Sequence, residues 1–525
     1  MLMKKFSMLM MGAAVLSSTA LFAQTKEEIA KLVAEDLTHE VYPGGVEGRA
    51  FWNGAARFFM YPPAFDFPTD AAAQSYRFEV VDAKGKMHVF EAERPSASLA
   101  CLWPRLPTGW TSVMCISHTK TDNRLVYLGS RTFWKQAPFT GDYPPAACGY
   151  GEFARRAKAW LFAQPAFQKF LKTKNPDCGY WGLIYPSKMV AAIVQALCSG
   201  EPTEQEVAAA RVWMDWILTL AEKPGRPLAY FTPTYFKVGK MTNNIVDEFG
   251  RQTMLDYPSR IGLALLALHS RTKDARYFDH AKGIAETYLK LQGEDGTWGM
   301  KLWIETGKSV KANRLMPVDS VIPFLEKMYE VTKDTRYRAA ADRAFGYVEA
   351  GPLKTWNWEA MFEDIDPDLP YRNLTKYGAT YTAMYLVRRY PNDARRLAKA
   401  RELLRFAEDQ FVCWEKPFPD MPKGHNMQDV PSWRVPGALE QYYWYLPIDA
   451  SASQMVMAYL ALYAAEKNPL DLAKARALGD AITRQQKPDG DVPTHWVCWD
   501  KGCSWWNCLL FDVKALNELE AVTAK

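Results

Sequence analysis

The pattern of apolar and polar positions changes character near residue 150. Beyond that point apolar residues, mostly Ala and Leu, recur at spacings of three and four, which is the period of an amphipathic helix. Read with this period, the sequence predicts helices near residues 151–172, 187–199, 204–222, 258–273, 275–293, 316–333, 336–350, 375–390, 394–412, 449–466, 470–487 and 506–522.

The links between these helices alternate between short and long. Residues 270–274 and 467–470 are links of only a few residues, so the helices that they join should be antiparallel neighbours. An open solenoid of the tetratricopeptide type would have short links on both sides. Short links on one side and long links on the other predict a closed (α/α)6 toroid with its long loops at one rim. Those loops lie near 223–257, 294–315, 351–374, 413–448 and 488–505.

Two of the predicted hairpins end in the same short sequence. Gln-x-x-Asp-Gly occurs at 292–296 and again at 486–490, each time after a helical run and before an aromatic loop. Asp-Gly is favoured in turns for its backbone geometry, so Asp295 and Asp489 are interpreted as turn residues rather than catalytic ones. They mark the points where a hairpin ends and a rim loop begins.

Residues before 136 follow a different period. Residues 76–90 alternate, turn at Lys84 and Gly85, and alternate again, which predicts a β-hairpin, and 111–118 and 124–133 add two strands. A small β-sandwich of the fibronectin or immunoglobulin kind accounts for this pattern. The predicted organisation is a signal peptide at 1–23, an extension with a short helix at 24–47, the β-sandwich at 48–135, a linker at 136–149 and the toroid at 150–525.

The N-terminus has the features of a secretory signal. Lys4 and Lys5 precede an apolar run over 8–22, and a small residue, Ala23, follows. The run is short for a membrane span, and no other stretch is long and apolar enough for one. We therefore expect export to the periplasm or the medium, with no membrane insertion of the mature chain.

Composition narrows the class of partner. The 525 residues are 48% hydrophobic and 23% charged, as in folded globular proteins. Removing Lys4 and Lys5 lowers the net charge from +5 to +3 (5 − 2), which gives no case for nucleic acid. The chain has 19 Trp and 26 Tyr, side chains that stack on sugar rings but also fill gaps between helices.

Cofactor and metal chemistry find little support. Cys498, Cys503 and Cys508 recur at spacing five, a weak zinc pattern, and a disulfide among them stays open. Sequences typical of dinucleotide, phosphate-loop, zinc-protease and serine-hydrolase sites are absent from the chain. We predict no cofactor and no structural metal.

A β-sandwich followed by six hairpins with Gln-x-x-Asp-Gly endings resembles the six-hairpin glycosidase superfamily. Residues 377–384 and 404–411 are similar in style to helices of such enzymes, and the resemblance covers 48–525 at the level of architecture. Toroid lyases of uronic-acid polysaccharides share this architecture. The resemblance implies an exported enzyme that processes oligosaccharides.

The rim loop at 423–445 is the richest in groups that could carry chemistry. Glycoside hydrolysis uses two carboxyl groups that flank the scissile bond, and Asp429 and Glu440 could supply them. Asp429 could equally cap a turn, and Glu440 could pair with an arginine. Other candidates in this loop are His425, Trp433, Arg434 and Tyr443.

Other rim segments add candidates of the same kinds. Residues 240–257 contribute Asn244, Asp247, Glu248, Arg251 and Tyr257. Residues 356–366 contribute Trp358, Glu359 and Glu363, which a surface-exposed acidic helical turn would also explain. Shorter segments contribute Trp181, Tyr185, Asn313, Arg314, His495, Trp496 and Trp506.

Three functions stay open on these residues. The first is hydrolysis of a uronate-containing oligo- or polysaccharide by carboxyl groups such as Asp429, Glu440, Glu363 or Glu248, with arginines holding the acidic sugar. The second is β-elimination by a lyase, with Tyr257 or His425 as base and Asn or Arg neutralising the carboxylate. The third is glycan binding without catalysis.

Overall fold

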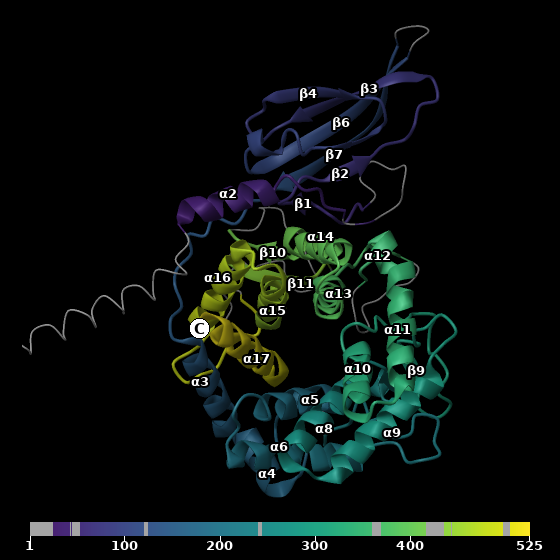
Figure 1. The fold of residues 1–525 in the computed structure, drawn as a ribbon, viewed down its shortest axis with the longest axis vertical. Coiled ribbons are helices and arrows are strands. Elements are labelled where there is room, and N and C mark those ends of the chain that lie inside the picture. The colour runs from purple at the N-terminus through teal and green to yellow at the C-terminus, as the bar shows by residue number, and fades with distance from the viewer. Residues whose placement is uncertain are drawn as a thin grey trace, which may run out of the picture.

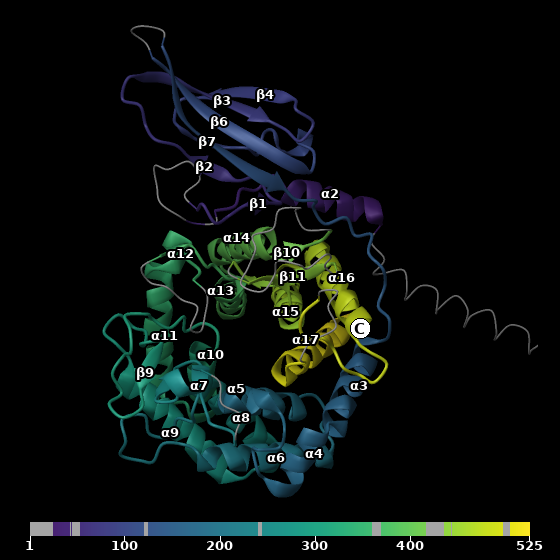
Figure 2. The same ribbon diagram turned by 180° about the vertical axis from the view of Figure 1, so that it is seen from behind.

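The computed structural model describes residues 25–42, 44, 53–119, 124–239, 244–359, 369–415, 435–442, 444–496 and 504–524. Figure 1 shows a ring of helices with the N-terminal strands stacked against one side of it, and Figure 2 shows the same arrangement from behind. The helices form an (α/α)6 toroid, so the predicted fold class is confirmed.

The ring has an inner and an outer layer of helices. In the inner helix α15 every residue from Ser451 to Leu460 is buried, as expected of a helix surrounded on all sides. The inner helices are α5 (Pro186–Leu197), α8 (Tyr257–Thr272), α10 (Val321–Thr332), α13 (Lys376–Arg389), α15 (Asp449–Glu466) and α17 (Trp506–Thr523). The outer helices are α3 (Tyr150–Ala163), α4 (Pro165–Thr173), α6 (Glu204–Thr219), α9 (Ala275–Leu291), α11 (Thr335–Ala350), α14 (Ala394–Phe411) and α16 (Pro469–Gln485).

The single helix expected over 151–172 is two helices, α3 and α4. Pro165 has no backbone N–H to continue α3, and it disfavours helical geometry at Gln164, which is extended with φ −64° and ψ 126°. Pro165 instead begins α4, where a missing N–H has no cost. Among the described residues, no helix has both the length and the apolar character needed to cross a bilayer.

The short links after α8 and α10 share one local structure. Lys273 and Lys333 adopt the left-handed conformation that ends a helix, with φ of 59° and 62°. Asp274 and Asp334 then cap the outer helix by accepting a backbone N–H two residues on. These links run from the end of an inner helix to the start of an outer one. The long connections therefore all precede the N-termini of inner helices, on the opposite rim.

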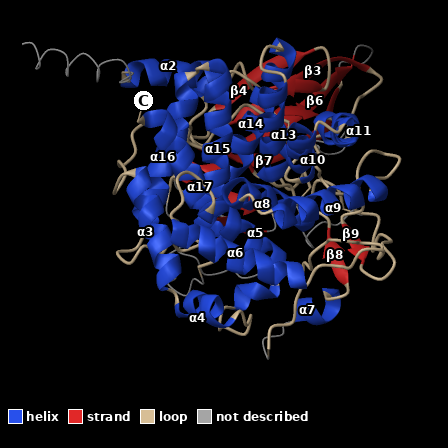
Figure 3. Ribbon diagram, turned by 60° about the horizontal axis from the view of Figure 1, so that its bottom comes forward, coloured by secondary structure: helices blue, strands red, loops and turns tan. Residues whose placement is uncertain are grey.

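The long connections carry small elements of their own. Figure 3 shows the ribbon of β8 and β9 beside α7 at the edge of the ring. The rim elements are η2 (Trp181–Ile184), α7 (Asn244–Phe249), β8 (Gln252–Met254), β9 (Lys301–Trp303), α12 (Pro352–Thr355), β10 (Val412–Cys413), β11 (Gly437–Gln441) and β12 (Trp444–Pro447). Strands β10, β11 and β12 form one antiparallel sheet in that order.

The repeated Gln-x-x-Asp-Gly sequence has the same structural role at both places. Gln292 Nε2 donates hydrogen bonds to the carbonyl oxygens of Gly296 (2.7 Å) and Ala340 (2.9 Å). Gln486 Nε2 likewise donates hydrogen bonds to the carbonyl oxygens of Gly490 (3.2 Å) and of Phe153 in α3 (3.1 Å). Each glutamine thus fastens the turn after its own outer helix to a neighbouring outer helix.

The N-terminal region contains helix α2 (Lys26–Asp36) and two sheets. Phe65 lies in the two-stranded sheet and Phe67 directly follows it, and both rings pack on Phe78 of the five-stranded sheet. The larger sheet has the order β1-β7-β6-β3-β4 and the smaller pairs β2 with β5. The strands are β1 (Phe58–Phe59), β2 (Ala64–Asp66), β3 (Ala73–Val81), β4 (Met87–Ala92), β5 (Ser96–Ser98), β6 (Gly109–Thr119) and β7 (Leu125–Lys135), with the 3₁₀ helix η1 (Trp103–Arg105) before β6.

A buried network of charges joins this region to the toroid. Asp36 of α2 accepts hydrogen bonds from Arg405 of α14 (2.7 Å) and Lys474 of α16 (3.2 Å). Glu408 accepts from Lys474 (2.7 Å) and from the hydroxyl of Tyr61 (3.0 Å). We call these five residues the docking network. All its charges are paired: Asp36 binds Arg405 and Lys474 across the interface, and Glu408 binds Lys474 within the toroid.

Candidate functional site

Ionisable side chains from every inner helix converge in the centre of the toroid. They lie at or near the N-terminal ends of those helices, on the rim that carries the long connections. We call the following residues the central cluster: Lys188 of α5, Asp256 and Arg260 at the start of α8, Asp319 just before α10, Lys376, Tyr377 and Tyr381 of α13, Glu440 of β11, Asp449 of α15, and Cys508 and Asp512 of α17.

Asp256 is a buried carboxyl group without a full set of partners. Its side chain is almost fully enclosed, at 1% exposed, and neither carboxylate oxygen has a hydrogen-bond partner among the described residues. The Arg260 guanidinium lies 3.5 Å away through Nε but forms its short hydrogen bond with Asp319. Burial raises the pKa of Asp256 to about 6, with Arg260 opposing the rise and Asp319 adding to it.

Asp449 and Asp512 form a buried pair of carboxyl groups. Asp449 Oδ1 accepts the N–H of Ala450 at 2.6 Å, and Asp512 Oδ1 accepts the hydroxyl of Ser453 at 2.7 Å. The Oδ2 atom of each is buried without a hydrogen-bond partner among the described residues. Burial raises the pKa of both well above the usual range, and the charge of Asp512 raises that of Asp449 further. Two buried carboxyl groups whose charges interact titrate as a coupled pair.

Glu440 enters the cluster beside a buried lysine. The Nζ of Lys376 donates to the backbone carbonyl of Glu440 (3.1 Å), as does the hydroxyl of Thr375 (2.9 Å). Lys376 Nζ lies 3.9 Å from the centre of the Tyr377 ring. Burial lowers the pKa of Lys376 to about 7, although the charge of Glu440 acts in the opposite direction. Burial, and next the Glu440 charge, raise the pKa of Tyr377.

Electrostatic coupling connects these groups into one site. Lys188 acts on the pKa of Asp256 and also on that of Cys508. The charges of Asp449, Asp512 and Glu440 in turn raise the pKa of Cys508, after burial as the main cause. Perturbed ionisable groups that gather in this way are typical of functional sites. The centre of the ring therefore holds Asp256, a buried carboxyl group with a raised pKa, and Glu440, whose charge acts on the pKa of Lys376 and Tyr377.

An aromatic wall stands next to the cluster. The Trp181 and Trp505 rings meet edge to face with centroids 4.2 Å apart, and Tyr185 lies 5.9 Å from Trp505. Lys188 Nζ lies 4.8 Å above the Trp505 ring. All three rings are half-buried, so each keeps some exposed surface. Aromatic faces beside a cation suit the apolar face and the charge of an acidic sugar.

Three predicted site residues lie in or beside this centre. Glu440 belongs to the cluster, and Trp181 and Tyr185 form part of the wall. Tyr257 is the first residue of α8 and is buried, with the Arg260 guanidinium 5.9 Å from its ring centre. His495 is half-buried, and burial lowers its pKa, so its neutral form is favoured.

Other predicted residues have partners elsewhere or face solvent. Asp247 and Glu248 are exposed on α7. Arg251 is exposed and pairs with Glu305 at 2.8 Å. Arg314 binds Asp295 and so closes the turn after α9, while the backbone of Asn313 accepts the N–H of Met300 at 2.9 Å. Glu359 accepts the N–H of Tyr371 at 2.8 Å.

Three predicted stacking tryptophans are core residues instead. Trp358 and Trp496 are fully buried, and Trp506 is 3% exposed with its ring stacked on Tyr180 at 3.7 Å. A sugar cannot stack on an indole whose two faces already contact protein. The alternative that large helical proteins use Trp to fill gaps holds for these positions. The predicted residues Glu363, His425, Asp429, Trp433, Arg434 and Tyr443, with the side chain of Asn244, lie outside the described residues.

Most residues of the central cluster were not predicted as site residues. Arg260, Lys376, Asp449 and Asp512 lie in segments predicted as helices, whereas nearly all predicted site residues came from loops. Asp256 lies in the predicted loop 223–257 but was not singled out there. A signal was available, because Asp512 interrupts an apolar run over 509–513 and a helical period would bury it. A charged residue at a buried position of an inner helix therefore indicates a site in the ring centre.

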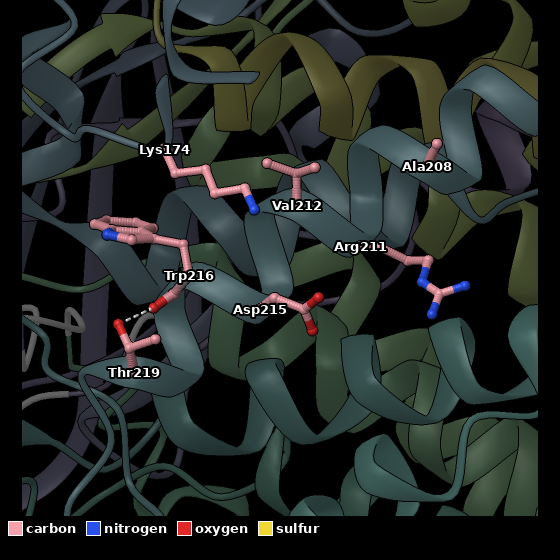
Figure 4. A pocket seen from close by; sticks show the side chains of 7 residues that line it. All are labelled: Lys174, Ala208, Arg211, Val212, Asp215, Trp216 and Thr219. Atoms are coloured by element: carbon pink, nitrogen blue, oxygen red, sulfur yellow. Dashed lines mark hydrogen bonds between the residues drawn. The ribbon is translucent and has the colours of Figure 1, made fainter. Parts of the chain in front are cut away.

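A shallow groove on the outside of the ring is separate from this centre. Figure 4 shows its lining along α6, where the Asp215 side chain points into the open space between Arg211 and the neighbouring helix. Asp215 accepts the hydroxyl of Tyr277 at 2.9 Å, so it already has a partner. The groove is lined by Lys174, Ala208, Arg211, Val212, Asp215, Trp216 and Thr219. Its surroundings offer no counterpart to the buried carboxyl groups of the ring centre.

Comparisons with known proteins agree with the observed fold. A D-mannose isomerase is 12% identical and matches with a TM-score of 0.52, over 71% of this chain and 97% of its own. A cellobiose 2-epimerase from Spirochaeta thermophila is 12% identical with a TM-score of 0.50, over 71% and 98%. A family 76 glycoside hydrolase from a bovine Bacteroides thetaiotaomicron strain is 14% identical with a TM-score of 0.48, over 88% and 96%.

No protein-family model and no curated protein sequence matches the chain. Identities this low show the fold alone. In fold, the chain resembles the six-hairpin (α/α)6-toroid proteins.

Proposed function

We propose that this chain is an exported carbohydrate-active enzyme that hydrolyses a glycosidic bond in a uronate-containing oligo- or polysaccharide. The observation that carries the proposal is the pair of carboxyl environments in the central cluster. Burial raises the pKa of Asp256 to about 6, whereas Glu440 lies beside Lys376 and its charge acts on the pKa of Lys376 and Tyr377. One protonated and one ionised carboxyl group are the requirement of glycoside hydrolysis.

The roles follow from these states. Asp256 in its protonated form would donate a proton to the leaving glycosidic oxygen, and its oxygens, without hydrogen-bond partners among the described residues, are available for this. Glu440 would act on the opposite side as base or nucleophile. Lys376 and Thr375 hold the Glu440 backbone in place. Asp449 and Asp512 form a buried pair behind it that can exchange a proton with the site.

Support for an acidic sugar comes from cations other than the predicted ones. Arg251 and Arg314 are engaged in ion pairs on the rim. Lys188 instead sits over the aromatic wall, and Lys301 Nζ lies 4.1 Å from the Phe249 ring centre on the neighbouring rim segment. A uronate ring on this wall would place its carboxylate near an ammonium group.

Lyase chemistry with Tyr257 or His425 as base stays the alternative. His425 lies outside the described residues, and the two tyrosines of the central cluster are poor bases. A lyase base must take a proton from carbon, and a tyrosine does this best when its pKa is lowered. Burial raises the pKa of Tyr377 and Tyr381 well above the usual range, so both keep their protons. The fold resemblance to a mannose isomerase and a cellobiose epimerase makes rearrangement of a sugar without cleavage a further outcome for the assay to detect.

The test is an assay of the mature chain with oligogalacturonides, chondroitin and heparin oligosaccharides, and with mannan and cellobiose as neutral controls. New reducing ends without ultraviolet absorbance from an unsaturated uronate are the expected result. Product that carries this absorbance would show a lyase, and a product of unchanged mass would show an isomerase or epimerase. No change in any uronate-bearing substrate would overturn the proposal.

A further inference from the structure

The last turn of α14 is fixed to the N-terminal strands by hydrogen bonds to backbone groups. Asp409 Oδ1 accepts the N–H of Met60 at 2.5 Å and that of Tyr61 at 2.7 Å, and both residues directly follow β1. Asp409 is fully buried. This helix end therefore moves with the N-terminal region.

The next residue extends this contact toward the rim. Gln410 Nε2 donates to the carbonyl oxygen of Phe58 in β1 at 3.2 Å, and Gln410 Oε1 accepts the hydroxyl of Tyr442 at 2.5 Å. The Tyr442 ring stacks on Phe411 with centroids 5.5 Å apart, and its backbone N–H donates to Leu374 at 3.1 Å. Both polar side chains are buried, so water does not compete for these bonds.

Tyr442 immediately follows β11, the strand that carries Glu440. β11 pairs with β10, which directly continues α14. On its other side, the carbonyl of Glu440 accepts from Thr375 and Lys376 at the start of α13. The strand is thus held between an inner helix and the helix end that the N-terminal region fixes.

We propose that the N-terminal β region positions Glu440 for catalysis through a hydrogen-bond relay from Phe58 by way of Gln410 to Tyr442. Gln410 and Tyr442 are positioning residues in this relay. The catalytic consequence rests on the proposed function, whereas the placement of β11 does not. β11 pairs with β10 on one side and β12 on the other, and the buried hydroxyl bond of Tyr442 at its end further limits the positions that it can adopt.

The test compares two variants that each remove one buried hydroxyl. Tyr442→Phe breaks the relay, while Tyr61→Phe removes a hydroxyl that bonds Asp36 and Glu408 in the docking network and does not contact β11. Hydrogen–deuterium exchange of peptides over 437–442 should quicken in Tyr442→Phe and stay as in wild type in Tyr61→Phe. On the uronate oligosaccharide that wild type cleaves, kcat of Tyr442→Phe should fall about tenfold to a hundredfold with KM within about twofold.

Exchange over 437–442 that is unchanged in Tyr442→Phe would overturn the relay, whatever the activity. Quickened exchange with unchanged kcat would overturn the positioning of Glu440. If wild type cleaves no uronate substrate, the proposed function fails, yet the exchange measurement still decides whether the N-terminal region holds β11. Gln410→Met removes the side-chain oxygen that accepts the Tyr442 hydroxyl. It should therefore quicken exchange over 437–442 as Tyr442→Phe does.

Discussion

Two buried clusters of charge in this molecule differ in how completely they are paired. In the docking network, burial alone would raise the pKa of Asp36, but Lys474 and Arg405 outweigh it and hold the pKa well below its usual range. In the central cluster, burial raises the pKa of Asp256 and Asp449 because cations do not compensate it. The two clusters therefore differ in the direction in which burial and neighbouring charge move the carboxyl pKa. A raised pKa does not by itself mark a reactive group, because burial also raises the pKa of the structural Asp409 to about 7.

The lysines show the same contrast. Lys474 is fully buried, which lowers its pKa, yet Glu408 and Asp36 reverse the effect and raise it above the usual value. Lys376 is equally buried, but the charge of Glu440 does not offset the burial, and its pKa falls to about 7. Complete pairing keeps a buried charge, whereas incomplete pairing leaves a group that can gain or lose a proton near neutral pH.

Glu440→Gln should produce the largest effect on activity. The amide keeps the shape of the side chain but cannot act as base or nucleophile, so kcat should fall by about 10²–10⁴-fold. The measurement is the initial rate of reducing-end release from the uronate oligosaccharide that wild type cleaves. Glu305→Gln, at the exposed rim pair, is the matched control and should keep full activity. Equal rates for Glu440→Gln and wild type would remove Glu440 from the mechanism.

Lys474→Met should produce the largest effect on stability. It leaves Asp36 and Glu408 buried without their shared cation, which costs about 3–5 kcal/mol in the free energy of unfolding. Urea denaturation followed by circular dichroism measures this loss. The folded variant should still cleave substrate at the wild-type rate, because among the described residues no hydrogen bond or ion pair joins the docking network to the central cluster. A variant as stable as wild type would show that the pairing is unimportant.

Lys376→Met should change how stability depends on pH. The pKa of Lys376 is about 7 in the folded state and has its ordinary value of 10.5 in the unfolded chain, so between these values the unfolded state binds more protons. Stability of wild type should therefore gain from rising pH over this window, and Lys376→Met should lose that gain. Lys474 has a raised folded pKa, so its contribution is full below the unfolded pKa and is lost as pH rises through the folded one. Identical pH slopes for wild type and Lys376→Met would contradict the burial of an ammonium group at this site.

Arg251→Ala should have the smallest effect of the series. Its guanidinium is exposed and pairs with Glu305 at the surface, where solvent screens the charges. Thermal unfolding should be indistinguishable from wild type, and KM for the uronate substrate should not change. A clear rise in KM would restore Arg251 to the sugar-binding residues predicted from the sequence.

The sequence determines the ring better than its centre. Periodicity and link length predicted the toroid, since apolar residues recur with the helical period and short links carry a turn and a cap, as at Lys273 and Asp274. The central cluster depends on which helix ends meet in space, and Asp256 and Asp512 are far apart in the chain. Trp358 and Trp496 were predicted to bind sugar because they lie in loop segments, but both side chains are buried in the core. Glu440 was found since it lies in a loop segment rich in polar groups.

The most direct test of the central claim is to measure both stability and turnover of Asp256→Asn at pH 8. At that pH most Asp256 is ionised in the wild type, because its pKa is about 6, and a buried charge with incomplete pairing costs stability. The account predicts that the amide variant unfolds at an equal or higher urea concentration while its kcat falls by about 10²–10⁴-fold. A variant that is less stable and still cleaves the uronate substrate at the wild-type rate would contradict it, since Asp256 would then be a structural carboxylate like Asp36.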